Sequence, residues 1–71
     1  MRLQVSDDEH LNDLIAFMRS VGCVAYAIDG NRLHVVVPDS LTERAARLRL
    51  AAYLDAWRRR RRGAEVAVLD D

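Results

Sequence analysis

Disulfides, lysines and long apolar runs are missing from this chain of 71 residues. Cys23 is the only cysteine, which excludes an internal disulfide and the two- to four-cysteine cage of a structural zinc site. No segment approaches the roughly 20 apolar residues of a membrane-spanning helix, and the first residues lack the basic and apolar stretches of a signal peptide. We therefore expect a cytoplasmic protein without membrane contact, metal or cofactor.

Because lysine is missing, all eleven basic side chains are arginines, and eleven acidic residues bring the formal charge to zero. The charge is unevenly distributed along the chain. Residues 1–40 carry six acids and three bases, whereas residues 41–71 carry eight bases and five acids. A dedicated nucleic-acid-binding domain is usually basic over one whole face. Nucleic-acid binding is therefore the weaker interpretation, and it is confined to the second half of the chain.

So short a chain has room for a single domain, residues 1–71, with one modest core. A folded chain of this size buries only about 60% of the surface that its unfolded form exposes. Small domains without disulfides or metals often associate with a second copy and so bury more apolar surface. The length alone therefore favours one domain that dimerises.

Residues 29–31, Asp-Gly-Asn, separate two short apolar runs, 23–28 and 33–37, and predict a central β-hairpin. Two registers are open. A two-residue loop pairs Ile28 with Leu33, whereas a three-residue loop shifts the pairing by one residue. Because side chains alternate along a strand, this shift exchanges the two faces of the first strand.

Neither register gives the hairpin a polar face. We expect Leu33, Val35 and Val37 to meet the helices. The opposite face then shows His34 and Val36. Its remaining residues depend on the register and are either Cys23, Ala25 and Ala27 or Val24, Tyr26 and Ile28. An antiparallel sheet that meets water on one side should alternate apolar with polar residues, so we expect another surface to cover this face.

An amphipathic helix is predicted after residue 6. Ser6 and Glu9 have the spacing of a capping box, in which a hydroxyl and a carboxylate bond free backbone N–H groups at a helix start. Gly22 is placed to end the helix. Between these ends, apolar residues recur at helical spacing and form one stripe: Leu11, Leu14, Ile15 and Met18.

A longer helix is predicted from about residue 41 to the arginine run, because this stretch has no proline or glycine and follows a second capping pair, Ser40 and Glu43. A surface helix normally has one apolar stripe, but this one has two. The stripes contain Leu41, Ala45, Leu48 and Ala52 on one side and Ala46, Leu50, Tyr53, Leu54 and Trp57 on the other. We expect the larger side chains to face the core. Either apolar area then stays outside, or the helix packs against both the sheet and the first helix.

Strand-sized segments at 2–5 and 65–69 complete a β-α-β-β-α-β order. This order resembles the ferredoxin-like fold, which is an α+β two-layer sandwich. The resemblance implies a four-stranded antiparallel sheet of strand order 4-1-3-2 with two helices on one face. It carries no functional assignment, because this fold hosts many unrelated functions.

Catalysis would have to use Cys23, His10 or His34. A cysteine nucleophile needs a base within hydrogen-bond reach. In one hairpin register His34 lies roughly 13 Å from Cys23, four residues away at about 3.3 Å per residue, and in the other the two side chains point to opposite faces. Neither register forms a dyad. We therefore expect no enzymatic activity and interpret Cys23 as a small buried apolar residue.

The most conspicuous local motif is a run of five arginines: Arg58, Arg59, Arg60, Arg61 and Arg62. Consecutive residues on a helix point all around its axis, so the run does not form one stripe. Cations at a helix C-terminus meet the negative end of the helix dipole, and Gly63 is placed to end the helix. A basic run can also bind phosphates, which keeps these arginines as possible nucleic-acid contacts.

Excess apolar surface therefore predicts a small interaction module, most simply a homodimer, rather than an enzyme. The partner surface is expected on the open sheet face or on the second stripe of the long helix. Its predicted residues are Tyr26, His34, Val36, Leu50, Tyr53 and Trp57.

Overall fold

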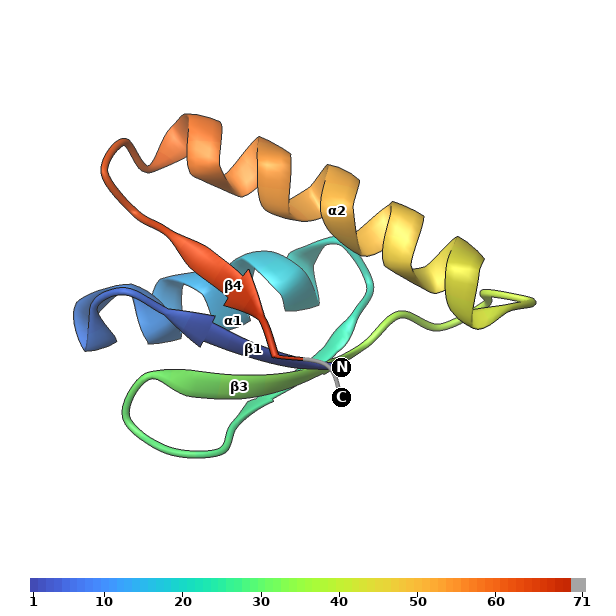
Figure 1. The fold of residues 1–71 in the computed structure, drawn as a ribbon, viewed down its shortest axis with the longest axis horizontal. Coiled ribbons are helices and arrows are strands. Elements are labelled where there is room, and N and C mark those ends of the chain that lie inside the picture. Colours follow the sequence, from blue (N-terminus) through green and yellow to red (C-terminus); the bar gives the residue numbers. More distant parts are fainter. Residues whose placement is uncertain (70–71) are drawn as a thin grey trace.

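The computed structural model describes residues 1–69 and has the predicted order of strands and helices (Figure 1). The strands are β1 (Arg2–Val5), β2 (Val24–Ala27), β3 (Arg32–Val36) and β4 (Val66–Val68). All neighbours in the sheet are antiparallel, and the strand order is β2-β3-β1-β4. This is the predicted order read from the other edge, so the ferredoxin-like α+β layout is confirmed.

The hairpin has the register of the three-residue loop. Ala27 lies opposite Leu33 and Tyr26 lies opposite His34. The loop is tightened by Asp29, whose carboxylate accepts hydrogen bonds from the backbone N–H of Arg32 at 3.1 Å and from its guanidinium Nε at 2.7 Å. Of the two open registers, the structure therefore selects the one that turns Tyr26 away from the helices.

The first helical segment is a 3₁₀ turn (η1, Asp8–His10) that continues into α1 (Leu11–Ser20). The prediction that Ser6 caps this segment was wrong. Asp7 is the cap, because its carboxylate accepts the N–H of Glu9 at 3.0 Å. Ser6 instead extends the pairing of β1 with the β4 segment, and its hydroxyl accepts the N–H of Glu65 at 3.2 Å. The predicted end of the helix holds, since Gly22 follows α1 with a φ of 93°.

The second helix, α2 (Glu43–Arg60), begins later than predicted. Thr42 rather than Ser40 is the cap, and its hydroxyl accepts the N–H of Ala45 at 3.0 Å. Thr42 has the extended backbone of a cap residue, whereas Asp39 has a φ of 62° that turns the chain before the helix. Leu41 therefore lies outside the helix and is 99% exposed. Neither α2 nor any other helix in residues 1–69 is long and apolar enough to cross a membrane.

One hydrophobic cluster joins the two helices to one face of the sheet. The larger stripe of α2 faces this cluster, as predicted, and buries Leu50, Leu54 and Trp57. Figure 1 shows α2 spanning the molecule above β4 and β1. The core also contains Leu3, Val5, Leu11, Leu14, Ile15, Met18, Cys23, Ala25, Leu33, Val35, Val37, Ala64 and Val66.

Candidate interaction surface

The face of the sheet that the helices do not cover carries an exposed apolar patch. Because side chains alternate along each strand, every buried residue of β2 and β3 has neighbours that point to this open face. Four large apolar side chains are exposed there: Val24 at 55%, Tyr26 at 51%, Ile28 at 44% and Val36 at 45%. We call these four residues, together with His34, the open-face patch.

The residues of the patch are neighbours across the strands. Val24 on β2 lies opposite Val36 on β3, and Tyr26 lies opposite His34. The rings of Tyr26 and His34 have centroids 5.3 Å apart, and their planes are inclined by 32°. Such cross-strand pairs stabilise a sheet and hold its side chains in fixed positions. Four of the five patch residues therefore lie on regular strands, and Ile28 directly follows β2 and donates its N–H to the carbonyl of Arg32 at 2.9 Å.

The other half of the open face, over β1 and β4, has a different composition. On β1, Arg2 lies opposite His34 and Gln4 lies opposite Arg32. Both β1 residues are exposed, and so is Ala67, the partner of Gln4 on β4. The large exposed apolar side chains of the open face thus lie over β2 and β3, whereas β1 contributes the polar Arg2 and Gln4 and β4 the small Ala67.

Each free edge of the sheet is closed by an arginine from a helix. In an antiparallel pair, residues alternate between those bonded to the neighbouring strand and those whose backbone groups point away. The carbonyl of Ala25 points away on β2, and it accepts two hydrogen bonds from the Arg19 guanidinium at 2.8 and 3.0 Å. On β4 the carbonyl of Val66 accepts a hydrogen bond from Arg58 at 2.6 Å. These arginines occupy backbone acceptors that an added strand would need.

The guanidinium groups of the arginine run are mostly engaged within the molecule. Besides the bond from Arg58, Arg59 pairs with Asp55 at 3.1 Å, and the Arg60 guanidinium lies 5.8 Å from the centroid of the Phe17 ring. Gly63, predicted to end the helix, has a φ of 84° just beyond the run. Within residues 1–69, Arg62 alone of the run makes no hydrogen bond, ion pair or ring contact.

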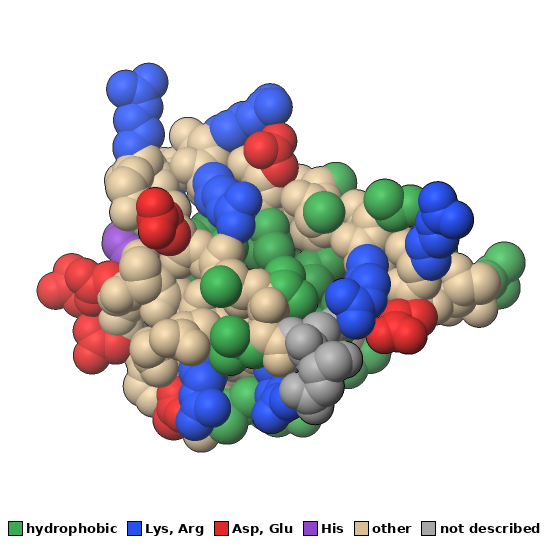
Figure 2. Space-filling model, viewed as in Figure 1, with side chains coloured by type: hydrophobic (Ala, Val, Ile, Leu, Met, Phe, Trp, Pro, Cys, Tyr) green, Lys and Arg blue, Asp and Glu red, His purple; other side chains and the backbone are tan. Residues whose placement is uncertain are grey.

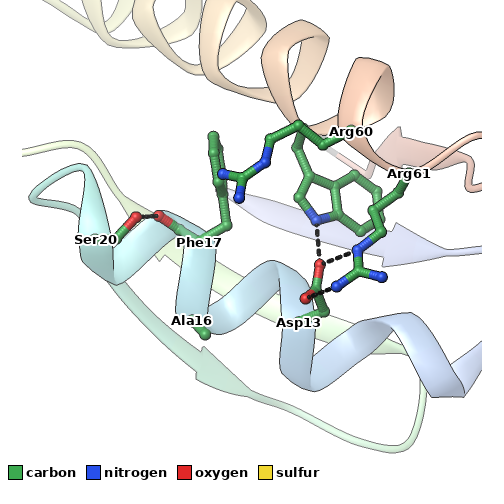
Figure 3. A pocket seen from close by; sticks show the side chains of 7 residues that line it. Asp13, Ala16, Phe17, Ser20, Arg60 and Arg61 are labelled. Atoms are coloured by element: carbon green, nitrogen blue, oxygen red, sulfur yellow. Dashed lines mark hydrogen bonds and ion pairs between the residues drawn. The ribbon is translucent and has the colours of Figure 1, made fainter.

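Arg61 joins the two helices through Asp13 (Figure 3). Its guanidinium donates to both carboxylate oxygens of Asp13, at 2.6 and 3.0 Å, and the indole N–H of Trp57 donates to the same carboxylate at 2.8 Å. The pKa of Asp13 is held below its ordinary value, mainly by the hydrogen bonds from Arg61 and to a lesser extent by the one from Trp57. This arrangement is a structural clamp between α1 and the end of α2.

The hollows on the helix layer are small. One, of about 230 Å³, lies beside the clamp and is lined by Phe17, Ser20 and Arg60 among others. Another, of about 220 Å³, lies between α2 and the sheet, where Figure 2 shows hydrophobic side chains exposed below the arginines of α2. Ligand pockets usually exceed about 300 Å³ and gather several polar groups around one point. A hollow of about 380 Å³ lies beside the hairpin loop, but it is a shallow depression between exposed residues such as Asp8 and Gly30. The open-face patch is therefore the stronger candidate for a functional surface.

The predicted reactive groups are not brought together. Cys23 is buried in the core, and burial raises the pKa of its thiol, whereas His34 lies on the opposite face of the sheet. The ring of His10 packs edge-on against Trp57 at 6.1 Å between centroids. Within residues 1–69, no three His, Cys, Asp or Glu side chains are grouped closely enough to hold a metal ion.

The predicted partner residues fall into two groups. Tyr26, His34 and Val36 lie on the open face, where a partner can reach them. Leu50 and Trp57 are 2% and 1% exposed. Their inclusion in the partner surface was wrong, because they belong to the stripe that fills the core. The remaining residue of that set, Tyr53, is half-buried against the core, and its hydroxyl accepts a hydrogen bond from Arg49 at 3.4 Å.

Two features of the surface were missed by sequence reasoning, namely the edge-closing arginines and the Asp13 clamp. Arg61 and Asp13 are 48 residues apart, so no local spacing links them. Arg19 is closer to its acceptor in sequence, but a basic residue near a helix end has an ordinary role beside the helix dipole. Only the strand order shows that these arginines reach a sheet edge.

Comparison of the chain with protein-family models, with curated proteins and with solved structures found no match. The functional interpretation therefore rests on geometry. Two observations carry it, namely the open-face patch and the closure of both sheet edges by arginines.

Proposed function

We propose that this chain is a non-catalytic interaction domain that forms a homodimer by packing the open-face patches of two copies against each other. The observation that carries the proposal is the exposure of Val24, Tyr26, Ile28 and Val36 on a sheet face that should otherwise be polar. Covering this face removes apolar surface from water, which is the main favourable term in protein association. A short chain with a modest core gains more from this burial than a larger domain does.

A second copy is a suitable partner because the patch is self-complementary. In a two-fold dimer the same surface serves both sides, and apolar residues meet apolar residues. A standard interface buries about 800 Å² on each partner, with an apolar centre and a polar rim. The patch supplies the centre, while Arg2 and Gln4 on one side and the ion pair of Arg32 with Asp29 on another supply a rim.

The edges of the sheet argue for face-to-face rather than edge-to-edge association. A partner strand could add to β2 only by displacing Arg19 from the carbonyl of Ala25, and to β4 only by displacing Arg58 from that of Val66. Charged side chains at an edge are a common protection against strand addition. On the open face of β2 and β3, the charged side chain of Arg32 lies at the loop end and is paired with Asp29, so it leaves the residues of the open-face patch exposed.

Sedimentation velocity at micromolar concentrations tests the proposal with a matched pair of variants. Val36→Lys places a charge within the patch, opposite Val24, and Leu48→Lys places the same charge on the outer side of α2, where Leu48 is 65% exposed. We expect the wild type and Leu48→Lys to be dimers. Val36→Lys should weaken dimerisation by about 100-fold, because an unpaired buried charge is expensive to desolvate.

Two results would overturn this proposal. If the wild-type protein stays monomeric throughout the concentration series, the proposed homodimer is contradicted. If Leu48→Lys dissociates the dimer while Val36→Lys still dimerises, the interface lies on α2 rather than on the open face. Circular dichroism of each variant shows whether it is folded and so separates lost association from lost structure.

Nucleic-acid binding by the arginine run is the competing proposal. Four of the five guanidinium groups already make intramolecular contacts, which favours a structural role for the run. Retention of the wild type on heparin, measured as salt is raised, tests the competitor. Arg59 and Arg62 can be replaced by glutamine without disturbing the clamp or the edge. We expect weak retention of the wild type; strong retention that this double variant loses would favour the competing function.

A further inference from the structure

We infer that His34 makes the homodimer sensitive to pH, so that protonation of its imidazole dissociates the two copies. The inference rests on the proposed homodimer. His34 lies on β3, an inner strand, between Tyr26 of β2 and Arg2 of β1. It is the only residue of the open-face patch that can gain a positive charge.

The surroundings of His34 favour the neutral ring within a covered interface. Its ring is tilted against Tyr26 at 5.3 Å between centroids. The charged groups nearest in the sheet are Arg2, directly opposite on β1, and Arg32, two residues along β3. The Arg32 guanidinium already pairs with Asp29 at the hairpin loop.

No acidic group compensates for a protonated ring. Within residues 1–69, His34 makes no ion pair, and the helices with their acids lie on the other side of the sheet. On the side of β1, the amino group of Met1 donates to the carbonyl of Val35 at 2.7 Å and adds a further positive charge near this end of the strand. A proton on His34 would therefore stand among arginines and an amino group without a carboxylate partner.

Dimerisation through the patch opposes protonation for two reasons. A charged group that loses its water without gaining a partner is strongly disfavoured. A two-fold axis also places a second His34 and a second Arg2 in the same interface, and like charges repel each other. Each copy must therefore release the proton of His34 in order to associate.

The expected size of the effect follows from proton linkage. Histidine side chains ordinarily titrate near pH 6.5, and two rings lose a proton for each dimer formed. If only neutral rings associate, the dissociation constant rises by about 100-fold between about pH 7.5 and about pH 5.5. Association is thus strong above the histidine range and is lost as the pH falls through it.

Sedimentation velocity of the full chain at these two pH values tests the inference with three proteins. The wild type should be a dimer at the higher pH and should dissociate at the lower one. His34→Gln should remain a dimer at both, because its side chain stays neutral. His10→Gln is the matched control and should behave as the wild type, since His10 lies on the helix layer against Trp57.

The outcomes separate this inference from the proposed function. A wild-type dimer whose affinity does not change with pH overturns the inference and leaves the homodimer standing, whereas a monomer at the higher pH overturns the homodimer. If His34→Gln still dissociates at the lower pH, the sensor is another group and the inference fails.

A second measurement applies if His34→Gln does not dimerise at all. Dilution of the wild-type dimer in weakly buffered solution near pH 6 should then take up protons, as an indicator dye reports, and His10→Gln should do the same. Dilution without proton uptake would contradict the inference.

Discussion

The two faces of the sheet differ in how completely the rest of the chain covers them. On β3 the residues that point to the helices, Leu33 and Val35, are fully buried, whereas His34 and Val36 on the other face remain accessible to solvent. The same five-residue strand therefore serves a closed core and an open surface. Helix packing explains the apolar residues of the covered face but not those of the open face. This difference is the reason for assigning the open face to a partner.

Within the open face, two regions also differ in the polarity of their side chains. Its β2 and β3 half carries the exposed apolar residues, while its β1 half carries Arg2 and Gln4. A face that only needed to meet water would be polar over all four strands. The division instead gives an apolar centre beside a polar margin, the arrangement found in protein interfaces.

The largest effect is expected on the covered face. Leu33→Ala removes a fully buried side chain between β1 and β2 and leaves a cavity, so it should lower the free energy of unfolding by about 3 kcal/mol. Urea denaturation at one fixed protein concentration measures this change. Ala67→Ser, on the open face of β4 and outside the open-face patch, is the control and should change it by less than about 0.5 kcal/mol. Equal losses for the two variants would contradict the distinction between the faces.

A smaller effect is expected at the Asp13 clamp, which holds the helices over the covered face. Because the pKa of Asp13 is lowered in the folded state, its stabilisation is present above the ordinary aspartate pKa of about 3.9 and is lost as the pH falls through the lower folded value. Asp13→Asn should therefore lower stability by about 1 kcal/mol at neutral pH, a figure reduced for the partial exposure of this carboxylate.

The test of the clamp compares urea denaturation of Asp13→Asn and the wild type at neutral pH and near pH 2. The difference should disappear in acid, because both proteins then lack the charged carboxylate. Asp55→Asn, which removes an exposed pair with Arg59, is the control and should change little. A difference that persists undiminished in acid would show that the ion pair is not its source.

The smallest effect on stability is expected at the edges between the two faces. Arg19→Ala with Arg58→Ala frees the carbonyls of Ala25 and Val66 while leaving the buried core intact. We expect cooperative unfolding to be kept, with slow growth of larger assemblies as strands add to the open edges. Light scattering over time measures this growth, and Arg44→Ala serves as a control on the exposed side of α2. Unchanged scattering would show that these arginines do not protect the edges.

Sequence patterns predicted the order of the strands and helices because hydrophobic periodicity and turn residues are local signals. They could not choose the hairpin register, since both loop lengths suit Asp29 to Asn31 and the choice depends on packing against α1. The helix caps were misassigned for a related reason. Ser6 and Ser40 have suitable spacing, but Asp7 and Thr42 stand close enough to replace them once the neighbouring backbone is fixed.

The candidate surface was predicted only in part. His34 and Val36 were placed on an open face by the alternation of strand residues, whereas the face of Tyr26 depended on the register, and the structure places all three on the open face. Leu50 and Trp57 were included because α2 carries two apolar stripes. Only the packing of the folded chain shows which stripe is buried in the core. The edge-closing arginines depend on tertiary neighbours that no local pattern records.

Nuclear Overhauser contacts between isotope-labelled and unlabelled copies test the central claim most directly. In a mixed sample near pH 7.5, contacts between different copies should join the ring of Tyr26 and the methyl groups of Val24, Ile28 and Val36. Intermolecular contacts that instead involve Leu48, or the absence of any at a concentration where the protein is dimeric, would contradict packing through the open face.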